Sequence, residues 1–224
     1  MRKHLFVLIA VTLLLFTSVA HGGGWNVVTV RDFPEYVVIG KPLSLTFKVW
    51  VPSEEPMTGL RPPLVHATNA SGRTFAVTSM TGPKAEEFTA TLSFPEPGDW
   101  TVSIDAEYPG AATLPPITAI QPDSPKPKPV SLETRGLRLF TIKGCNSCHL
   151  HPEIKNGHFY GPELPDKRFS AAYLRRFLGD PSIAPEPGEI CSKDRVRCNQ
   201  PYAMPSLNLK NEEIEALVAF LTKS

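Results

Sequence analysis

The chain has 224 residues, 24 prolines and a formal net charge of +1 at pH 7. This length fits one large domain or two small ones, and apart from its proline content the composition is ordinary for a globular protein. A charge this small does not indicate a nucleic-acid partner.

The N-terminus has the pattern of an export signal. Basic residues precede an apolar run over residues 5–16, and Ser18 and Ala20 fit the small-residue cleavage rule, so the mature chain is expected to begin near His21. Even if it is extended to Ala20, the apolar run (residues 5–20) is shorter than the roughly 20 residues that span a bilayer. This favours a cleaved signal peptide (residues 1–20) over a retained membrane anchor, and a periplasmic or otherwise exported protein.

Residues 24–120 have the period of two that is typical of half-buried strands. Pro-Gly turn signals separate the apolar segments, and no helical stripe of useful length is present. Candidate strands lie at 28–30, 43–49, 64–68, 74–78, 87–94 and 100–105. This pattern of about seven short strands predicts an antiparallel β-sandwich of immunoglobulin-like type.

Within this region, His66 with Met57 and Met80 could form a His/Met set suited to copper. The plainer interpretation is a packed histidine and two ordinary methionines. The region has no cysteine, so the ligand set of blue copper proteins is missing. We favour a docking or spacer module.

Residues 121–130 alternate proline with polar residues, which favours an extended polyproline II linker. At about 3.1 Å per residue, it could separate two domains by roughly 30 Å.

The net charge also changes across this segment. Residues 24–120 have six Lys/Arg against ten Asp/Glu, a net of −4, and residues 121–224 have fifteen against twelve, a net of +3. This asymmetry permits electrostatic docking between the halves or with different partners.

The segment Cys145-Asn146-Ser147-Cys148-His149 has the C-x-x-C-H pattern of c-type haem attachment. Each thiol can add to one vinyl group of the same porphyrin, and His149 can place an imidazole nitrogen on the iron. The alternatives are a thiol redox motif or half of a zinc site. Zinc would need a second close pair, but six residues rather than two separate Cys191 from Cys198.

Around this motif the period becomes helical. One helix is expected to run from Leu132 into Cys145, and another to end the chain, with Ile214, Leu217, Val218 and Leu221 on one face. Acidic residues in the first turn of the last helix suit the helix dipole. Its N-cap is left open between Asn208 and Asn211, because Lys210 stands where Ser or Asp is usual.

Together these residues resemble a class I cytochrome c domain over residues 131–224. The matching positions are Gly136, Phe140, the 145–149 motif, Gly161-Pro162-x-Leu164, a middle helix over 173–181 and Ala203-Met204-Pro205. The resemblance implies an all-α domain with one covalent haem c, in which the first and last helices cross closely at Gly136.

The resemblance also assigns roles to single residues. The Pro162 carbonyl is expected to accept the Nδ1 proton of His149 and so to fix the imidazole. Met204 is expected to supply the sixth ligand, and a His/Met pair raises the reduction potential. His158, more remotely His66, or an open position are the alternatives, whereas His151 is too near the proximal ligand in sequence to reach the opposite face.

The two cysteines outside the motif are Cys191 and Cys198, separated by a polar segment. In an exported protein, where disulfides persist, they are expected to form a local disulfide. Free thiols or a metal pair are the alternatives.

We therefore expect an exported electron carrier rather than an enzyme, because no acid/base pair or nucleophile is arranged for catalysis. Its partners are expected to be redox proteins, with possible association with a membrane redox complex. Basic side chains (Lys167, Arg168, Arg175 and Arg176) could steer an acidic partner, or they could form an ordinary solvated face. Two other functions stay open: a haem-based gas sensor or ligand-binding module, and a cytochrome subunit of a larger oxidoreductase.

Overall fold

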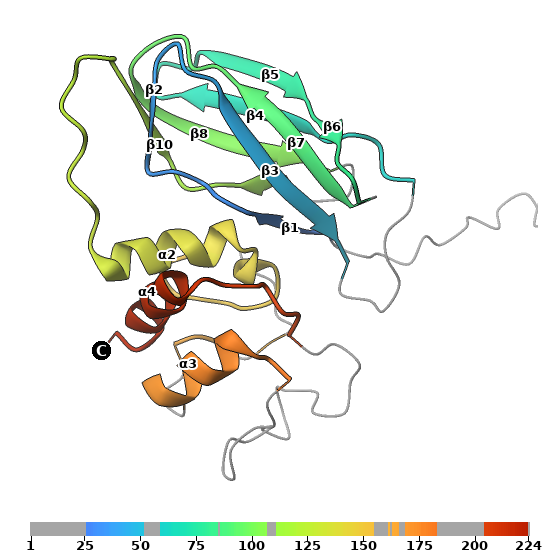
Figure 1. Cartoon of the computed structure of the whole chain (residues 1–224), viewed down its shortest axis with the longest axis vertical. Coiled ribbons are helices and arrows are strands. Elements are labelled where there is room, and N and C mark those ends of the chain that lie inside the picture. The colour runs from blue at the N-terminus through green and yellow to red at the C-terminus, as the bar shows by residue number, and fades with distance from the viewer. Residues whose placement is uncertain are drawn as a thin grey trace, which may run out of the picture.

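The computed structural model describes residues 26–51, 59–84, 86–106, 111–154, 161, 163–165, 169–182 and 204–223. A β-rich region comes first and a helical region follows it (Figure 1). None of the described helices has the length and apolar character needed to span a membrane. The predicted signal peptide lies outside the described residues.

The strands form two sheets. The first has the order β1 (Val27–Val30), β3 (Leu43–Trp50), β7 (Glu87–Leu92) and β6 (Met80–Thr81). The second has the order β2 (Tyr36–Val38), β10 (Ile117–Ile120), β8 (Gly98–Asp105), β4 (Leu64–Asn69) and β5 (Thr74–Thr78), with β9 (Ala112–Thr113) beside β8. Among the described pairs only β2 and β10 are parallel.

Alternation of side chains along the strands explains the core of this region. Leu45, Phe47 and Val49 on β3 are buried, and so are Trp100 and Val102 on β8, whereas their neighbours in sequence are more exposed. Residues from both sheets belong to one apolar cluster. This is the pattern of antiparallel sheets that cover a core on one face only. Every predicted strand is present, and the short strands β2, β6, β9 and β10 were not predicted.

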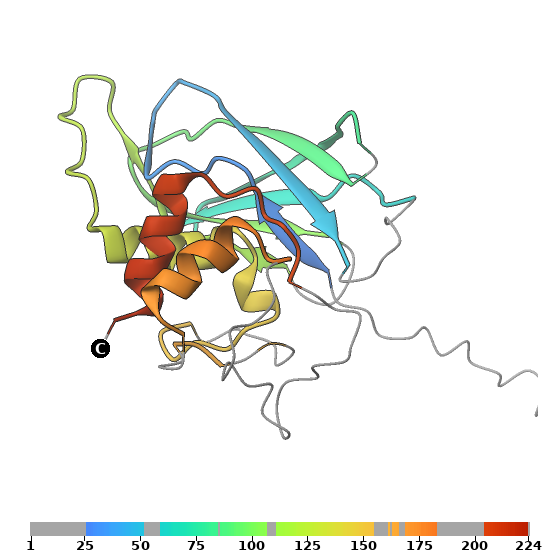
Figure 2. The same ribbon diagram turned by 60° about the horizontal axis from the view of Figure 1, so that its bottom comes forward.

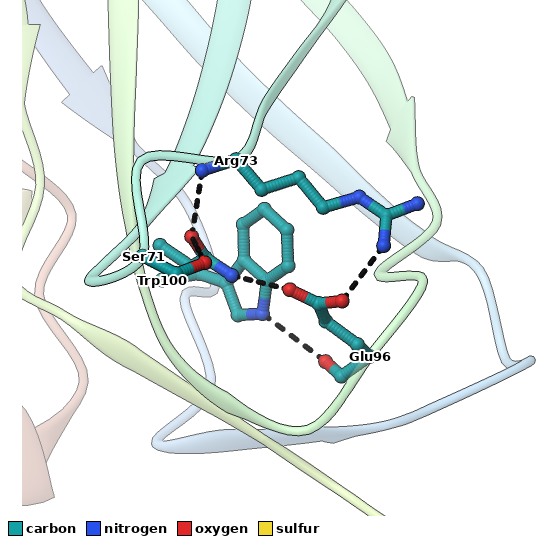
Figure 3. A network of polar contacts seen from close by, with 5 residues as sticks. Ser71, Arg73, Glu96 and Trp100 are labelled. Carbon is teal, nitrogen blue, oxygen red and sulfur yellow. Dashed lines mark hydrogen bonds and ion pairs between the residues drawn. The ribbon is translucent and has the colours of Figure 1, made fainter.

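A polar network fastens two turns of the β region together (Figure 3). The Asn69 side chain accepts from the Ser71 hydroxyl and the Arg73 amide, at 2.8 and 2.9 Å, and donates to Glu96. The Glu96 carboxylate also pairs with Arg73 at 2.7 Å, and its carbonyl accepts from the Trp100 indole at 3.2 Å. The β4–β5 turn is therefore tied to the turn that enters β8.

The helical region contains α2 (Leu132–Ile142), the short 3-10 helix η1 (Cys145–Ser147), α3 (Ala171–Gly179) and α4 (Asn211–Leu221). The hydroxyls of Ser131 and Ser170 cap α2 and α3, each accepting an amide at 3.1 Å. The N-cap of α4 is Lys210, so neither Asn208 nor Asn211 has that position. The Glu213 carboxylate accepts the Lys210 amide at 3.0 Å, as in a capping box.

Helices α2 and α4 cross in close contact (Figure 2). A Cβ atom on Gly136 would overlap the Ala216 carbonyl oxygen and lie 2.6 Å from the Phe220 Cβ. Phe140 and Phe220 pack edge to face beside this point, with ring centroids 5.8 Å apart. The close crossing predicted at Gly136 is confirmed, because only glycine lets the two backbones approach this far.

Gly136→Ala is expected to destabilise the protein by about 1–3 kcal/mol or more, because the added methyl group meets backbone that cannot move aside. Urea unfolding of the haem-loaded protein measures the loss. Gly179→Ala is the matched control, since its methyl group would meet nothing closer than Ile214 Cδ1 at 3.8 Å. Equal unfolding midpoints for the two variants would contradict the prediction.

The linker does not hold the two regions apart. It forms an extended loop after β10 and leads into α2, which lies under β1 (Figure 1). The segment after β1 receives ion pairs from the helical region: Asp32 with Lys210 at 2.9 Å and Glu35 with Arg135 at 3.3 Å. Arg138 donates to the Pro116 carbonyl at 2.7 Å. The β region and the helical region are therefore in direct contact.

Lys143 is buried where the two regions meet. Its ammonium group pairs with Glu213 at 2.8 Å and donates to the Arg31 carbonyl at 2.9 Å. Both side chains of the ion pair are largely shielded from solvent, with 6% and 13% exposed. Lys143 therefore joins the end of α2, the start of α4 and the end of β1.

Lys143→Met is expected to cost about 3–5 kcal/mol, because it leaves the buried Glu213 carboxylate without its ammonium partner. Chemical unfolding compares it with Arg175→Met, which breaks the exposed Arg175–Glu215 pair at 2.8 Å and should change stability little. Similar small losses in both variants would mean that burial does not strengthen the Lys143 pair.

Candidate haem site

The C-x-x-C-H segment lies on one tight turn immediately after α2. Gly144 has a φ of +74°, a left-handed conformation that glycine adopts easily, and it reverses the chain at the end of the helix. The Gly144 carbonyl accepts the Ser147 amide at 3.0 Å, and the Cys145 carbonyl accepts the amides of Cys148 and His149 at 3.1 and 2.9 Å. The two thiols and the imidazole are thereby held within one turn, as attachment to a single haem requires.

The side chains of Cys145 and Cys148 are both partly buried. Burial, and secondarily the neighbouring Cys148, raises the pKa of the Cys145 thiol to about 12. Reactive cysteines of thiol redox motifs have lowered pKa values instead. The surroundings of Cys145 therefore argue against the thiol redox alternative.

The imidazole of His149 lies against the backbone of Gly161. A Cβ at position 161 would overlap the ring, with His149 Nδ1 only 2.6 Å away. Backbone hydrogen bonds hold this segment in place, from the Gly161 amide to the Cys148 carbonyl at 2.8 Å and from the Leu164 amide to the Leu150 carbonyl at 2.9 Å. The Gly161 backbone thus packs directly against one histidine ring and restricts its orientation, which fits a histidine-ligated haem.

Met204 packs against the same apolar cluster as Cys145, and it is partly buried. That cluster is formed by buried residues of α2, α3 and α4 together with Leu164, and Phe177 packs against it. Cys145 and Met204 therefore both contact the helical core, and ligation of the iron by Met204 stays a prediction. Pro162 lies outside the described residues, so its hydrogen bond to His149 stays a prediction.

His151 belongs to the helical core. It is 6% exposed, and its ring lies 4.2 Å from that of Phe220 and 5.7 Å from that of Phe140, measured between centroids. Nδ1 accepts the Glu153 amide at 3.2 Å, and Nε2 has no hydrogen-bond partner among the described residues. Desolvation lowers the pKa of His151. This histidine is a buried packing residue, a role that its sequence neighbourhood did not indicate.

Several predicted residues lie outside the described part of the chain. These are His158, the possible competing ligand, the proposed disulfide pair Cys191 and Cys198, and the basic residues Lys167 and Arg168. Arg175 is described, and its guanidinium pairs with both carboxylate oxygens of Glu215 at 2.8 and 3.0 Å. Its charge is thus already compensated within the helical region.

The copper set considered for the β region is not assembled in the described residues. His66 lies on β4, opposite Ala76 and Ser103, whereas Met80 lies on β6 of the other sheet and is 65% exposed. Met57 lies outside the described residues. No group of three or more His, Cys, Asp or Glu side chains that could hold a metal occurs within the described ranges.

The fold and the site define the C-terminal part as a small helical domain for covalent haem attachment. Residues 133–224 match the family model of cytochrome c. This part of the chain is a cytochrome c domain that follows a β-rich region, and it carries a covalently bound haem c. Its general function is haem-based electron transfer with redox proteins.

Similarity to solved structures is weak. A β-glucosidase from Listeria innocua has a TM-score of 0.31 and 12% identity, over 43% of this chain and 16% of that one. Domains 4 and 5 of the S-layer protein SbsC have 0.27 and 13%, over 42% of this chain and 50% of that one. The CARDB domain of the PF1109 protein from Pyrococcus furiosus has 0.27 and 15%, over 44% and 90%. With TM-scores this low, these similarities support no inference. The search of curated proteins gives no match.

Gly161→Ala is expected to push the His149 imidazole out of its position and weaken its hold on the iron by roughly 10–100-fold, as the loss of a group that orients a metal ligand typically does. Acid titration of the ferric absorption spectrum measures this. Protons compete better for a loosely held imidazole, so the transition moves to higher pH. Gly179→Ala is the control, and an identical transition in both variants would contradict the prediction.

Proposed function

We propose that this chain is an exported electron carrier, in which His149 and Met204 are the two axial ligands of a haem c bound to Cys145 and Cys148. The haem supplies a reversible one-electron couple between Fe(III) and Fe(II). The observation that carries the proposal is the fit of the His149 imidazole to the Gly161 backbone, in a site whose apolar core also receives Met204.

The surrounding residues have three roles in this proposal. Gly161 and the segment to Leu164 orient the His149 ring, and a fixed ring keeps the ligand geometry similar in both oxidation states. Tyr173 and Leu174 on α3 are buried in the helical core, where they limit water. Two covalent thioether links at Cys145 and Cys148 would keep the haem from dissociating.

We propose an electron carrier rather than an enzyme because two side-chain ligands would leave no open position for a substrate on the iron. The proposal includes cleavage of the signal peptide, export to the periplasm or beyond, and a Cys191–Cys198 disulfide. Its partners would be redox proteins, with association with a membrane redox complex as one form of that partnership.

We also propose that the β region is an immunoglobulin-like sandwich. The order β1-β3-β7-β6 opposite β2-β10-β8-β4-β5 supports this, since residues of both sheets share one core. Antiparallel pairing within each sheet, apart from β2 and β10, is also typical of the class. The described β region has neither of the cysteines that join the sheets of antibody domains.

Met204→Ala is expected to abolish the long-wavelength absorption band that methionine gives with ferric haem in cytochromes c, and to lower the reduction potential. The ferrous variant should bind CO promptly, because one axial position is then open. Met80→Ala is the matched control, since Met80 lies exposed on β6.

Persistence of the band in Met204→Ala would refute the ligand assignment. Prompt, stoichiometric CO binding by the ferrous wild-type protein would instead favour the gas-sensor alternative, because a carrier with both axial positions filled excludes the gas. Spectra and potentials are taken on the same samples, so that loss of haem is distinguished from loss of a ligand.

A further inference from the structure

Strand β1 lies directly against the residue before the haem-attachment motif. A Cβ on Gly144 would lie 2.7 Å from the Val28 carbonyl oxygen and 2.8 Å from Val27 Cγ1. Val27 is 1% exposed, yet it belongs to neither of the two apolar cores. Its side chain therefore packs over the turn at Gly144, and the conformation of this turn sets the direction in which the chain enters Cys145.

The last turn of α2 is anchored in the β region. Ile142 is 3% exposed and packs in the core of the β region, whereas Leu139 and Phe140 of the same helix belong to the helical core. One helix thus contributes to both cores within a single turn, and it does so immediately before the haem-attachment turn.

Lys143, which lies between Ile142 and Gly144, also forms hydrogen bonds with the β region. Its carbonyl accepts the Thr29 hydroxyl at 3.4 Å, and its ammonium group donates to the Arg31 carbonyl at 2.9 Å. Residues 142, 143 and 144 are therefore all in contact with the β region, through a buried side chain, hydrogen bonds and close backbone packing.

We propose that β1 and Arg31 position the haem-attachment turn, so that the β region tunes the reduction potential and axial ligation of the haem. The inference rests on the proposed electron-transfer function. Haem potentials depend on packing, hydrogen bonding and solvent exposure around the ligands. If β1 moves away, the turn carrying Cys145 loosens and water approaches the haem. Water stabilises the more highly charged ferric state, so the potential falls.

The test uses the full haem-loaded chain with two variants at this contact, and each is matched to a substitution in the core of the β region. Val27→Ala is compared with Val65→Ala, and Ile142→Ala with Ile104→Ala. All four remove buried apolar atoms and leave the charge unchanged. Each variant is assayed by redox titration, by thermal unfolding and by the rate at which cyanide replaces a ferric axial ligand.

The expected result is a lower reduction potential and several-fold faster cyanide binding in Val27→Ala and Ile142→Ala. The two controls should lose stability but keep the wild-type potential and rate. If each contact variant matches its control in potential and rate, the proposal is overturned. Should an alanine variant fail to fold, Ile142→Val against Ile104→Val gives the same comparison with a smaller cavity.

The two proposals can fail separately. If the wild-type haem gave no reversible couple, the proposed function would fail. Positioning by the β region would still be judged from the cyanide rates: faster in Val27→Ala than in Val65→Ala supports it, and equal rates overturn it.

Discussion

The end of helix α2 is the constraint on which both halves of this protein depend. Ile142 fills the core of the β region, Lys143 joins β1 to α4, and Gly144 turns the chain toward Cys145. Each residue has a different physical task, and the three are consecutive, so a shift in any one is passed to the next. A rigid connection of this kind links the β region to the haem site more directly than the linker of residues 121–130 does.

The interactions between the β region and the helical region differ in strength. The Asp32–Lys210 pair is exposed and the Glu35–Arg135 pair is half-buried, and pairs that water and salt can reach add little to stability. Lys143 and Glu213 are buried, so separating them would be costly, although burying them also required desolvation. Apolar burial at Ile142 and Val27 has no such cost. We therefore assign most of the stability of the contact to these two side chains and the geometric specificity to Lys143.

Much of the site could be predicted from the sequence because its chemistry depends on local spacing. The C-x-x-C-H motif places two thiols and an imidazole within one turn whatever surrounds them, and Gly136 marks a close helix crossing. Strands with strong alternation, such as β3 and β8, were equally clear. Short strands such as β2 and β9 could not be predicted, since two or three residues are too few to show a period.

Long-range contacts account for the rest. Nothing in the sequence around His151 indicates burial between Phe140 and Phe220, because that depends on how α2 and α4 cross. The contacts of Lys143 are also long-range, because its partners Arg31 and Glu213 are distant in sequence. The proline-rich linker predicted separation, but its extended backbone also permits the chain to return, and burial of Ile142 favours the returned arrangement.

Contacts between the two regions also change how their net charges are interpreted. Residues 24–120 have a net charge of −4 and residues 121–224 have +3, which is compatible with docking of one on the other. In the structure, acids of the β segment at Asp32 and Glu35 meet bases of the helical region at Lys210 and Arg135. Arg175 is likewise compensated by Glu215. These bases are engaged within the molecule, so the field that a redox partner meets is weaker than their number suggests.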